Sequence, residues 1–519
     1  MNSPFTTESS PEPRTSRWIY VIAASAFLLQ FITAARYGYF RDELYYIDCA
    51  RHLSWGYVDQ PPLIAFITWL ELHITGTSLY SLRLFPALAA GLTVWLAARL
   101  AHKLGAGVVG QSLTALAVLV APGFLVMFHL LTMNAFEPLL WTLGVYLVTR
   151  IIQTGNQKLW LWFGVVCGIG ILNKYSMLFF GTGVAFGLIL TRERRAFFGK
   201  WIWLGFAIAM LIWLPNVIWN VQHHWPFLEL MRNVRSGGRD VTRSFFPFLL
   251  DQIFFMHFFT APLWIAGALW YFWGREDSAE RGRYRTLGWT YLFLLCFFVF
   301  GKGKSYYLWP VYPMLFAAGG VAIERWTAIR ARVLRPVYLT ALVLGGALLA
   351  PMAVPILSPE NFIRYQDALH LTPPEIEHQR NGPLRHQIFA DMFGWDEIAA
   401  ETARAYFNLP PDIRAKTGIA AGGYGDAGAI DFFGPKYGLP PAVSGHQTYW
   451  FWGPHGYTGE SLLLLGQPAR RAHELCVNAD VVGHVTHAYS REDEHYDIYW
   501  CHPLKWDLQL IWPRVKHFD

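Results

Sequence analysis

Two acidic clusters follow the first apolar run of the chain. The first reads Arg41-Asp42-Glu43-Leu44-Tyr45-Tyr46, and the second reads Tyr57-Val58-Asp59-Gln60-Pro61-Pro62. Carboxylates next to a bilayer are costly unless water, a partner or a ligand stabilises them, so ionisable groups at membrane depth are functional candidates. A carboxylate at the lipid–water boundary can act as a general base on an acceptor hydroxyl or amine. The placement therefore predicts chemistry on a molecule held in the membrane.

Each acidic cluster also has a structural interpretation. Asp42 and Glu43 can cap a helix over 42–53, where the helix dipole favours negative charge, or serve as a base that Arg41 keeps ionised. Asp59 can cap the helix that follows it. Because Asp59 shares the outer face with Asp42, it can instead help to hold a divalent cation that bridges phosphate oxygens. The sequence leaves these alternatives open.

A second set of candidates lies at the outer ends of later apolar runs. Glu137 is a lone acid within an apolar run, where it either serves the reaction or pairs with a basic residue of a neighbouring helix. Glycines let a backbone approach a ligand closely, and lysines suit phosphate. Both types occur in the stretch Gly301-Lys302-Gly303-Lys304-Ser305-Tyr306-Tyr307. Lys174 and these lysines either bind an anionic ligand or simply extend toward the membrane surface.

The composition places these residues in a membrane protein. Only 15% of the 519 residues are charged and 54% are hydrophobic, whereas a soluble protein carries about 25% charged residues. The deficit is concentrated before about residue 355, in runs near the ~20 apolar residues needed to cross a bilayer. We predict an all-α polytopic domain with about eleven spans. They are expected at 18–35, 79–99, 107–122, 133–150, 158–172, 175–191, 200–219, 249–273, 286–300, 306–323 and 336–356.

Basic residues cluster in the short loops at one end of these spans. They include Arg17, Arg99, Lys103, Arg150, Lys158, Arg192, Arg194, Arg195, Lys200, Arg283, Arg285, Arg325, Arg330, Arg332 and Arg335. By the positive-inside rule this end is cytoplasmic, so the 36–78 loop and the region after 356 lie outside. These topology-setting loops account for the net charge of +6, and nucleic acid is not an expected partner.

Two segments outside the spans are large enough to carry structure of their own. The 36–78 loop has the apolar spacing of amphipathic helices over 42–53 and 62–73, which we expect to lie on the outer membrane surface. The tail alternates short helices and strands, which predicts a small α/β domain. We expect helices at Trp395–Phe407 and Asp426–Phe433, and strands at Thr417–Ala421, near Ala442 and at Leu462–Leu465. The domains are then 1–356 and 357–519.

Two sequence motifs in the tail each allow two structural interpretations. Cys476 and Cys501 can form a disulfide if the tail is outside the cytoplasm, or they can stay free and buried. Gly423, Gly425 and Gly428 match the dinucleotide-binding pattern after a short strand, but that pattern expects an acidic residue about 20 positions later. The chain reads His446-Gln447-Thr448-Tyr449 there. A tight turn between strand and helix is the better interpretation of these glycines.

Taken in order, these segments resemble the family 39 glycosyltransferases, which include protein O-mannosyltransferases and bacterial lipid A aminoarabinose transferases. The resemblance covers most of 35–320. It is carried by Arg41-Asp42-Glu43-x-Tyr45-Tyr46, Tyr57-Val58-Asp59-Gln60-Pro61-Pro62-Leu63, Asn134-x-x-Glu137-Pro138-Leu139, Leu172-Asn173-Lys174-Tyr175-Ser176 and Tyr306-Tyr307-Leu308-Trp309-Pro310-Val311-Tyr312-Pro313. In the tail, 424–428 and 444–450 are similar to bacterial members.

The resemblance implies a GT-C membrane fold with a large first external loop and a sugar donor carried on polyprenyl phosphate. It implies that Asp42 is the catalytic carboxylate that activates the acceptor, and it suggests a metal or phosphate role for Asp59. Gln60 departs from the aminoarabinose transferases, which tend to have lysine there. We expect a substrate-binding set of Glu43, Asp59, Glu137, Lys174, Lys302, Lys304, Tyr306 and Tyr307. Apart from a divalent cation held by Asp59, no cofactor is expected.

The expected function is glycosyl transfer at the periplasmic face of the bacterial inner membrane. The sugar would pass from a polyprenyl-phosphate donor, among membrane lipids, to a lipid, protein or polysaccharide acceptor. A transporter or flippase of lipid-linked sugars is the main alternative. Transporters often carry internal repeats with broken helices in matching positions, and the sequence shows no such repeat. A scaffold that only binds partners would not require carboxylates beside the bilayer.

Overall fold

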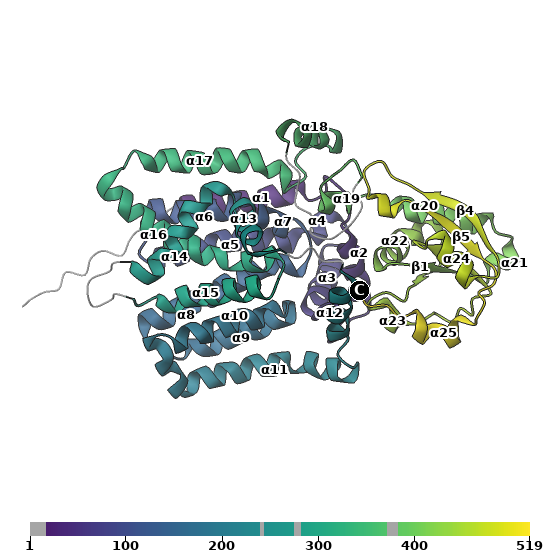
Figure 1. Ribbon diagram of the computed structural model, residues 1–519, viewed down its shortest axis with the longest axis horizontal. Coiled ribbons are helices and arrows are strands. Elements are labelled where there is room, and N and C mark those ends of the chain that lie inside the picture. Colours follow the sequence, from purple (N-terminus) through teal and green to yellow (C-terminus); the bar gives the residue numbers. More distant parts are fainter. Residues whose placement is uncertain (1–16, 239–242, 275–281, 371–381) are drawn as a thin grey trace, which may run out of the picture.

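The structure, a computed structural model, describes residues 17–238, 243–274, 282–370 and 382–519. A bundle of helices that run side by side forms one end of the molecule, and a sheet covered by helices forms the other (Figure 1). The C-terminal end of the chain lies at the junction between the two parts. The site described below also lies at this junction.

Within these described ranges, the bundle is built from thirteen helices. They are α1 (Trp18–Thr33), α5 (Leu84–Lys103), α6 (Val108–Val120), α7 (Pro122–His129), α8 (Met133–Thr154), α9 (Leu159–Asn173), α10 (Ser176–Ile189), α11 (Lys200–Gln222), α13 (Phe245–Phe255), α14 (Ala261–Trp273), α15 (Arg285–Phe300), α16 (Tyr312–Arg330) and α17 (Leu334–Leu349). Short 3₁₀ helices are η1 (Arg192–Phe198), η2 (Phe258–Thr260), η3 (Ser305–Val311), η4 (Ala350–Met352), η5 (Gly434–Tyr437) and η6 (Glu492–Glu494).

All eleven stretches expected to span the membrane are helical. Among the described residues, five helical stretches are long and apolar enough to cross a membrane, and two bent pairs raise that number to seven. The five are Leu79–Lys103, Met133–Thr154, Lys200–Gln222, Ser305–Arg330 and Leu334–Met352. The bent pairs are Val108–Val120 with Pro122–His129 and Phe245–Phe255 with Phe258–Trp273. The other four expected spans coincide with apolar helices of 10–17 residues. The chain is a multi-pass membrane protein, and the number of spans stays a prediction.

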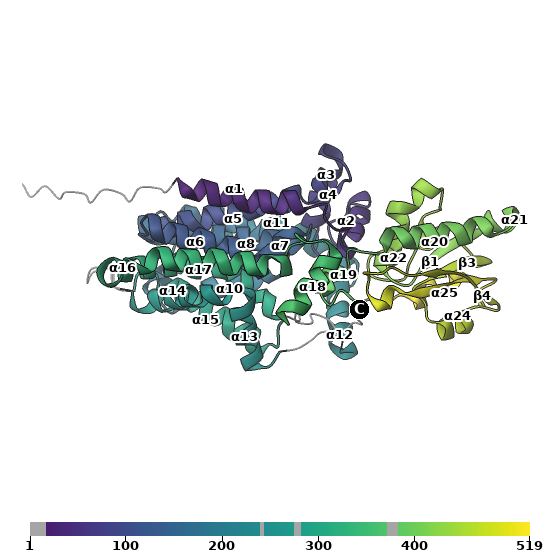
Figure 2. The same ribbon diagram turned by 90° about the horizontal axis from the view of Figure 1, so that it is seen from above.

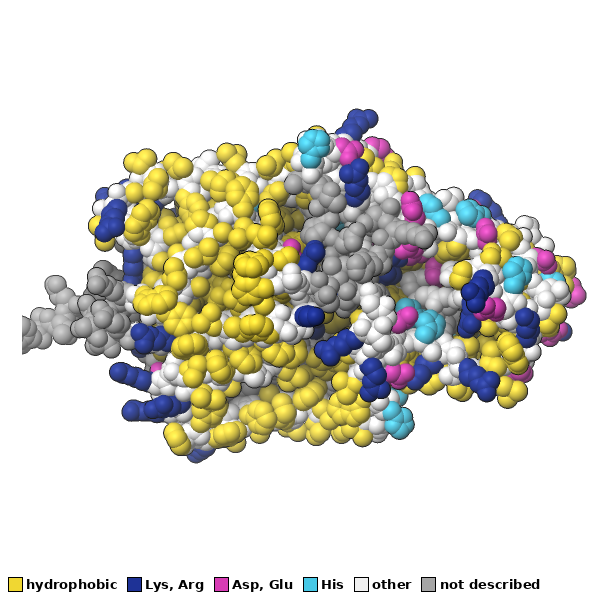
Figure 3. All heavy atoms as spheres, viewed as in Figure 1, with side chains coloured by type: hydrophobic (Ala, Val, Ile, Leu, Met, Phe, Trp, Pro, Cys, Tyr) yellow, Lys and Arg dark blue, Asp and Glu magenta, His cyan; other side chains and the backbone are white. Residues whose placement is uncertain are grey.

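The basic loops lie together at the end of the bundle opposite the sheet. Gln153 Nε2 donates to the carbonyl of Lys103 at 2.5 Å and to the Tyr284 hydroxyl at 2.9 Å. Arg283 donates to the carbonyl of Gln153 at 3.0 Å. Figure 3 shows Lys and Arg side chains gathered at this end and a broad hydrophobic belt between it and the tail. Such a belt fits the hydrocarbon part of a bilayer.

The segments between spans add helices on the side of the tail. The first external loop forms α2 (Arg41–Arg51), α3 (Leu63–Ile74) and α4 (Leu79–Leu82), so both helices expected there are present. Two further helices are α12 (Pro226–Gly237) and α18 (Pro359–Leu369). The boundary predicted at 356/357 falls between η4 and α18.

The tail is a mixed five-stranded sheet with the strand order β2-β1-β3-β5-β4. Its strands are β1 (Thr417–Ala421), β2 (Ala442–Val443), β3 (Ser461–Leu465), β4 (Ala479–Val485) and β5 (Tyr496–Cys501). β1 runs parallel to β2 and β3, whereas β5 runs antiparallel to β3 and β4. Ile419 pairs with Ala442 on one side and Leu463 on the other. The small α/β domain is therefore confirmed.

Helices cover both faces of this sheet (Figure 2). They are α19 (Gln387–Ala390), α20 (Trp395–Asn408), α21 (Pro411–Arg414), α22 (Tyr424–Phe433), α23 (Tyr449–Trp452), α24 (Ala469–Leu475) and α25 (Leu508–Val515). Side chains alternate along β3: Leu463 and Leu465 join the core on the α20 and α22 side, whereas Leu462 and Leu464 face the other core. That second core contains the disulfide between Cys476 and Cys501.

The first external loop contributes to the core of the tail. Leu44, Tyr45 and Ile47 of α2 share one hydrophobic cluster with Trp395 and Leu463. Every residue from 43 to 50 is buried. α2 therefore lies buried between the bundle and α22, and its expected position at the outer membrane surface stays a prediction.

Candidate active site

A cavity of about 200 Å³ lies where the bundle meets the tail. Its walls come from the start of α2, from α7 and α8, from η3 and from α19. Its polar lining consists of Arg41, Asp42, Thr132, Asn134, Lys304, Tyr306, His386, Gln387 and Asp391. Three residues predicted from the sequence, Asp42, Lys304 and Tyr306, thus meet in one cavity.

Asp42 lies in the first turn of α2, where the helix dipole favours its ionised form. The Tyr424 hydroxyl donates a hydrogen bond to Asp42 Oδ1 at 2.8 Å. Arg41 Nε lies 3.6 Å from the same oxygen. The Asp42 side chain keeps 27% of its surface exposed. Asp42 is therefore a partly accessible carboxylate on the cavity wall, the position that a general base requires.

Glu43 has a different environment from its neighbour. It is fully buried, and Arg83 donates to both of its oxygens at 2.8 Å. The backbone N–H groups of Phe40 and Leu131 donate to the same carboxylate at 2.8 and 3.0 Å. Glu43 therefore caps α2 and anchors it to the bundle, as the structural interpretation predicted, and it does not line the cavity.

Asp59 lies near Asp42 but outside the lining of the cavity. Its Oδ1 accepts a hydrogen bond from the Tyr45 hydroxyl at 2.9 Å. Burial raises the pKa of Tyr46 well above its usual value, and the carboxylates of Asp42 and Asp59 add to the rise. Both acids therefore lie close enough to Tyr46 to affect the same hydroxyl. The capping interpretation of Asp59 is wrong, because Pro62 and not Asp59 occupies the N-cap position of α3.

Lys174 and Glu137 form a buried pair next to the cavity. Lys174 Nζ donates to Glu137 Oε2 at 2.8 Å and to Asn134 Oδ1 at 2.6 Å, and Ser176 donates to the other oxygen of Glu137. The Lys174 ammonium lies 5.3 Å from the Tyr306 ring centroid and 5.2 Å from that of Tyr307. The predicted pairing of Glu137 with a neighbouring basic residue is confirmed. Asn134 and Tyr306 connect this pair to the cavity wall.

The two lysines before η3 are not equivalent. Lys304 lines the cavity, whereas Lys302 is exposed and has a φ of 53° at the tip of its turn. Only Lys304 therefore faces the same space as Asp42. The spacing of the two lysines could not distinguish them, because the turn between them decides which one points inward.

Comparisons with known proteins agree with this arrangement. Residues 59–219 match the family model of dolichyl-phosphate-mannose-protein mannosyltransferases. Lipid A galacturonosyltransferase RgtD of Rhizobium johnstonii is 26% identical over 269 residues, which are 47% of this chain and 52% of that protein. The chain therefore matches about half the length of this relative. The resemblance to the family 39 glycosyltransferases is confirmed.

The fold is confirmed as GT-C by a solved structure. The crystal structure of ArnT from Cupriavidus metallidurans bound to undecaprenyl phosphate superposes with a TM-score of 0.58 at 16% identity. The superposition covers 94% of this chain and 98% of that one. It therefore includes both the bundle and the tail.

In this GT-C chain the tail supplies cavity residues that the sequence did not indicate. Asp391 faces the cavity and pairs with Arg491 Nε at 2.6 Å. Burial lowers the pKa of His386 to about 4, so this histidine lines the cavity as a neutral donor and acceptor. These residues carry no recognisable spacing. Only the fold brings them to Asp42.

The glycines of the discounted dinucleotide motif hold the tail against α2. A Cβ on Gly425 would lie 2.8 Å from Arg41 Cγ, and one on Gly428 would lie 3.1 Å from Leu44 Cβ. Larger residues there would therefore separate α22 from α2. A tight turn does occur after β1, and close helix packing is the second use of these glycines.

A second contact between α2 and the tail involves two acids and a tyrosine. The Tyr449 hydroxyl lies 2.5 Å from Asp48 Oδ2 and 3.2 Å from Asp431 Oδ2. Burial, and then the nearby Asp431 carboxylate, raise the pKa of Asp48, and burial also raises the pKa of Asp431. The two carboxyls therefore share the Tyr449 hydroxyl in this interface.

Three potential metal ligands gather elsewhere in the tail. Within the described part of the chain, His446, His517 and Asp519 are the residues whose ligand atoms lie close enough to hold an ion together. His517 places its two ring nitrogens 2.9 Å from the carbonyl of Val515 and 3.0 Å from that of Gly422. Each ring nitrogen of His517 thus lies within hydrogen-bond distance of a backbone carbonyl, and a neutral imidazole can donate to only one of the two.

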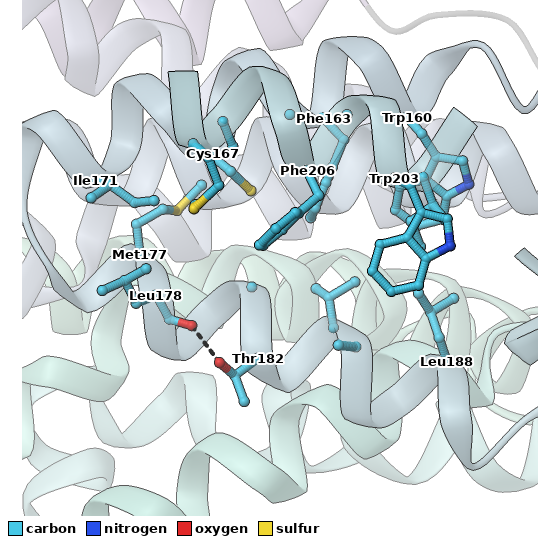
Figure 4. Close-up of a pocket in the computed structure, with 18 of the residues that line it drawn as sticks. Trp160, Phe163, Cys167, Ile171, Met177, Leu178, Thr182, Leu188, Trp203 and Phe206 are labelled. Atoms are coloured by element: carbon cyan, nitrogen blue, oxygen red, sulfur yellow. Dashed lines mark hydrogen bonds between the residues drawn. The ribbon is translucent and has the colours of Figure 1, made fainter. Parts of the chain in front are cut away.

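A larger cavity of about 310 Å³ lies within the bundle, between α9, α10 and α11 (Figure 4). Its walls are almost entirely apolar and aromatic, and Thr182, its one hydroxyl residue, donates to the carbonyl of Leu178 at 2.8 Å. Charged side chains are missing from its described lining. The described lining of this cavity therefore offers no charged group for acid–base chemistry.

Proposed function

We propose that this protein transfers a sugar from a polyprenyl-phosphate donor to an acceptor at the periplasmic face of the bacterial inner membrane. The observation that carries the proposal is the junction cavity, which places the Asp42 carboxylate and the Lys304 ammonium in one small space beside the membrane. Undecaprenyl phosphate in the ArnT structure and the lipid A acceptor in the name of RgtD support this class of donor and a membrane-borne acceptor.

The proposed reaction uses the residues of the cavity in defined roles. Asp42 takes the proton of the acceptor hydroxyl or amine as that atom bonds to the anomeric carbon of the sugar. The bond between this carbon and the phosphate oxygen breaks, and its electron pair leaves with the polyprenyl phosphate. Lys304 and Arg41 stabilise the charge that develops on the departing phosphate. Attack opposite the leaving group inverts the anomeric centre.

We assign the remaining predicted residues by their positions. Tyr306 contacts the donor from the cavity wall, while Tyr307 and the Glu137–Lys174 pair hold that wall in place. Glu43 anchors α2. Asp59 remains the proposed ligand for a divalent cation at the edge of the site, outside the cavity lining, because a carboxylate oxygen is the ligand type that such cations prefer.

The orientation in the membrane is part of the proposal. The basic loops at the far end of the bundle favour a cytoplasmic position for that end. The disulfide between Cys476 and Cys501 supports a tail outside the cytoplasm, because disulfides persist in oxidising compartments. With this orientation the junction cavity lies on the outer side.

Product analysis tests the proposed function. The purified full-length protein would be reconstituted in vesicles with undecaprenyl-phosphate sugars and cell-envelope lipids, peptides or glycans as acceptors. We expect one undecaprenyl phosphate to be released for each sugar transferred. Movement of intact lipid-linked sugar across the vesicle membrane, with no release of undecaprenyl phosphate, would instead identify a transporter.

The two lysines before η3 allow a matched test of donor binding. We expect Lys304→Met to raise the KM for the donor by about tenfold, because it removes one charge-assisted contact to phosphate. Lys302→Met removes the same charge two residues away, outside the cavity, and should change KM by less than about twofold. Steady-state kinetics with varied donor would show the difference. Equal effects of the two substitutions would contradict the assignment.

A further inference from the structure

One hydrogen bond connects the tail directly to the proposed base. The Tyr424 hydroxyl donates to Asp42 Oδ1 at 2.8 Å, although the two residues lie 382 positions apart. We propose that Tyr424 is a positioning residue for the Asp42 carboxylate. The C-terminal domain then contributes a functional residue to the active site. This inference rests on the proposed role of Asp42 in glycosyl transfer.

The surroundings of Tyr424 fix the direction of its hydroxyl. The guanidinium carbon of Arg41 lies 5.4 Å from the centre of the Tyr424 ring, and the Tyr45 ring lies 4.9 Å away. The His446 ring packs at 5.1 Å, and the backbone N–H of Tyr424 donates to His446 Nδ1 at 3.2 Å. Contacts from α2 and from the tail thus hold the Tyr424 ring in place.

The backbone of the tail is shaped for this contact. Tyr424 is the first residue of α22, and the Gly425 and Gly428 positions on this helix face Arg41 and Leu44 of α2 at close range. Their lack of a side chain lets the helix that carries Tyr424 lie directly against the helix that carries Asp42. The buried cluster shared by α2 and α22 stabilises this approach.

A hydroxyl that donates to a carboxylate has two effects on a base. It stabilises the ionised form, so the base stays competent at lower pH, and it restricts the rotation of the carboxylate. Tyr424 itself neither receives the proton nor touches the bonds that change. Removal of the Tyr424 hydroxyl should therefore affect kcat and the pH dependence of kcat more than substrate binding.

Tyr424→Phe tests the inference because it removes the hydroxyl and keeps the ring. In reconstituted vesicles we expect kcat to fall about tenfold, KM to stay within about twofold, and the acidic limb of the pH–rate profile to move up by about one pH unit. Tyr496→Phe is the matched control, since Tyr496 donates to Asp426 at 2.7 Å within the tail and neither residue lines the cavity. This control should leave the profile unchanged.

Chemical labelling gives a measurement that needs no turnover. Carbodiimides modify protonated carboxyls, so the pH dependence of Asp42 modification, resolved from Glu43 by tandem mass spectrometry, reports the protonation of Asp42. We expect its midpoint to rise in Tyr424→Phe and to stay constant in Tyr496→Phe. If folded Tyr424→Phe showed neither a shifted labelling midpoint nor a shifted acidic limb, the inference about Tyr424 would be wrong. Sugar transfer by the wild type would still support the proposed function in that case. If the wild type released no polyprenyl phosphate, the proposed function would be wrong. The labelling would still show whether the Tyr424 hydroxyl affects the protonation of Asp42.

Discussion

Asp42→Asn is expected to lower kcat for sugar transfer about 10³-fold, with little change in KM. Asparagine has nearly the shape of aspartate and still accepts a hydrogen bond from Tyr424, so the site keeps its form. What the substitution removes is the ability to take the proton of the acceptor. Release of undecaprenyl phosphate in reconstituted vesicles, measured with saturating donor and acceptor, would report the loss.

A control for this substitution exists in the same chain. Asp426 is also a carboxylate that accepts a tyrosine hydroxyl, that of Tyr496, at 2.7 Å, but it does not line the cavity. Asp426→Asn should therefore retain turnover within a few fold of the wild type. If Asp42→Asn retained comparable activity, Asp42 would not be the base, and the proposed reaction would lose its proton acceptor.

The elements that carry this site follow from local patterns in the sequence. Apolar runs placed every expected span on a helix, and the alternation in the tail placed β1 at Thr417–Ala421. The order of the motifs along the chain also grouped Asp42, Lys304 and Tyr306 into one set of candidate residues. These predictions succeed because helix periodicity and bilayer thickness act over short stretches of chain.

The division of roles between neighbours could not be read from the sequence. Asp42 and Glu43 are adjacent acids, yet successive helix positions point in directions about 100° apart. One therefore faces the cavity and the other faces Arg83, which follows 40 positions later. The partner of each acid depends on tertiary packing, which composition and spacing do not encode.

The contribution of the tail to the site could not be predicted from the sequence for a related reason. The apolar positions of α2 resemble those of an interfacial helix, but side chains from both the bundle and the tail bury this helix. Asp391 lines the cavity, and Tyr424 contacts Asp42, only because the tail docks against α2. A motif with glycines marks this docking helix, but its pattern predicted only a tight turn and not the close helix packing.

The ion pair between Arg83 and Glu43 should be the most important single contact for the position of α2. Its two side chains are 1% and 0% exposed. Arg83 also donates to the carbonyl of Ala34 at 2.5 Å and to that of Gly38 at 2.9 Å. Removal of one partner from such a pair leaves an uncompensated buried charge, which costs about 3–5 kcal/mol.

We therefore expect Arg83→Met to lower the free energy of unfolding by about 3–5 kcal/mol and to abolish transfer together with the position of Asp42. Arg404→Met is the control, because Arg404 pairs with Glu401 on α20 with 72% of its side chain exposed, and such pairs contribute about 0–1 kcal/mol. Tryptophan fluorescence during denaturant unfolding in detergent would measure both. Equal losses for the two variants would mean that the buried pair does not anchor α2, and the position of Asp42 would then depend on the tail alone.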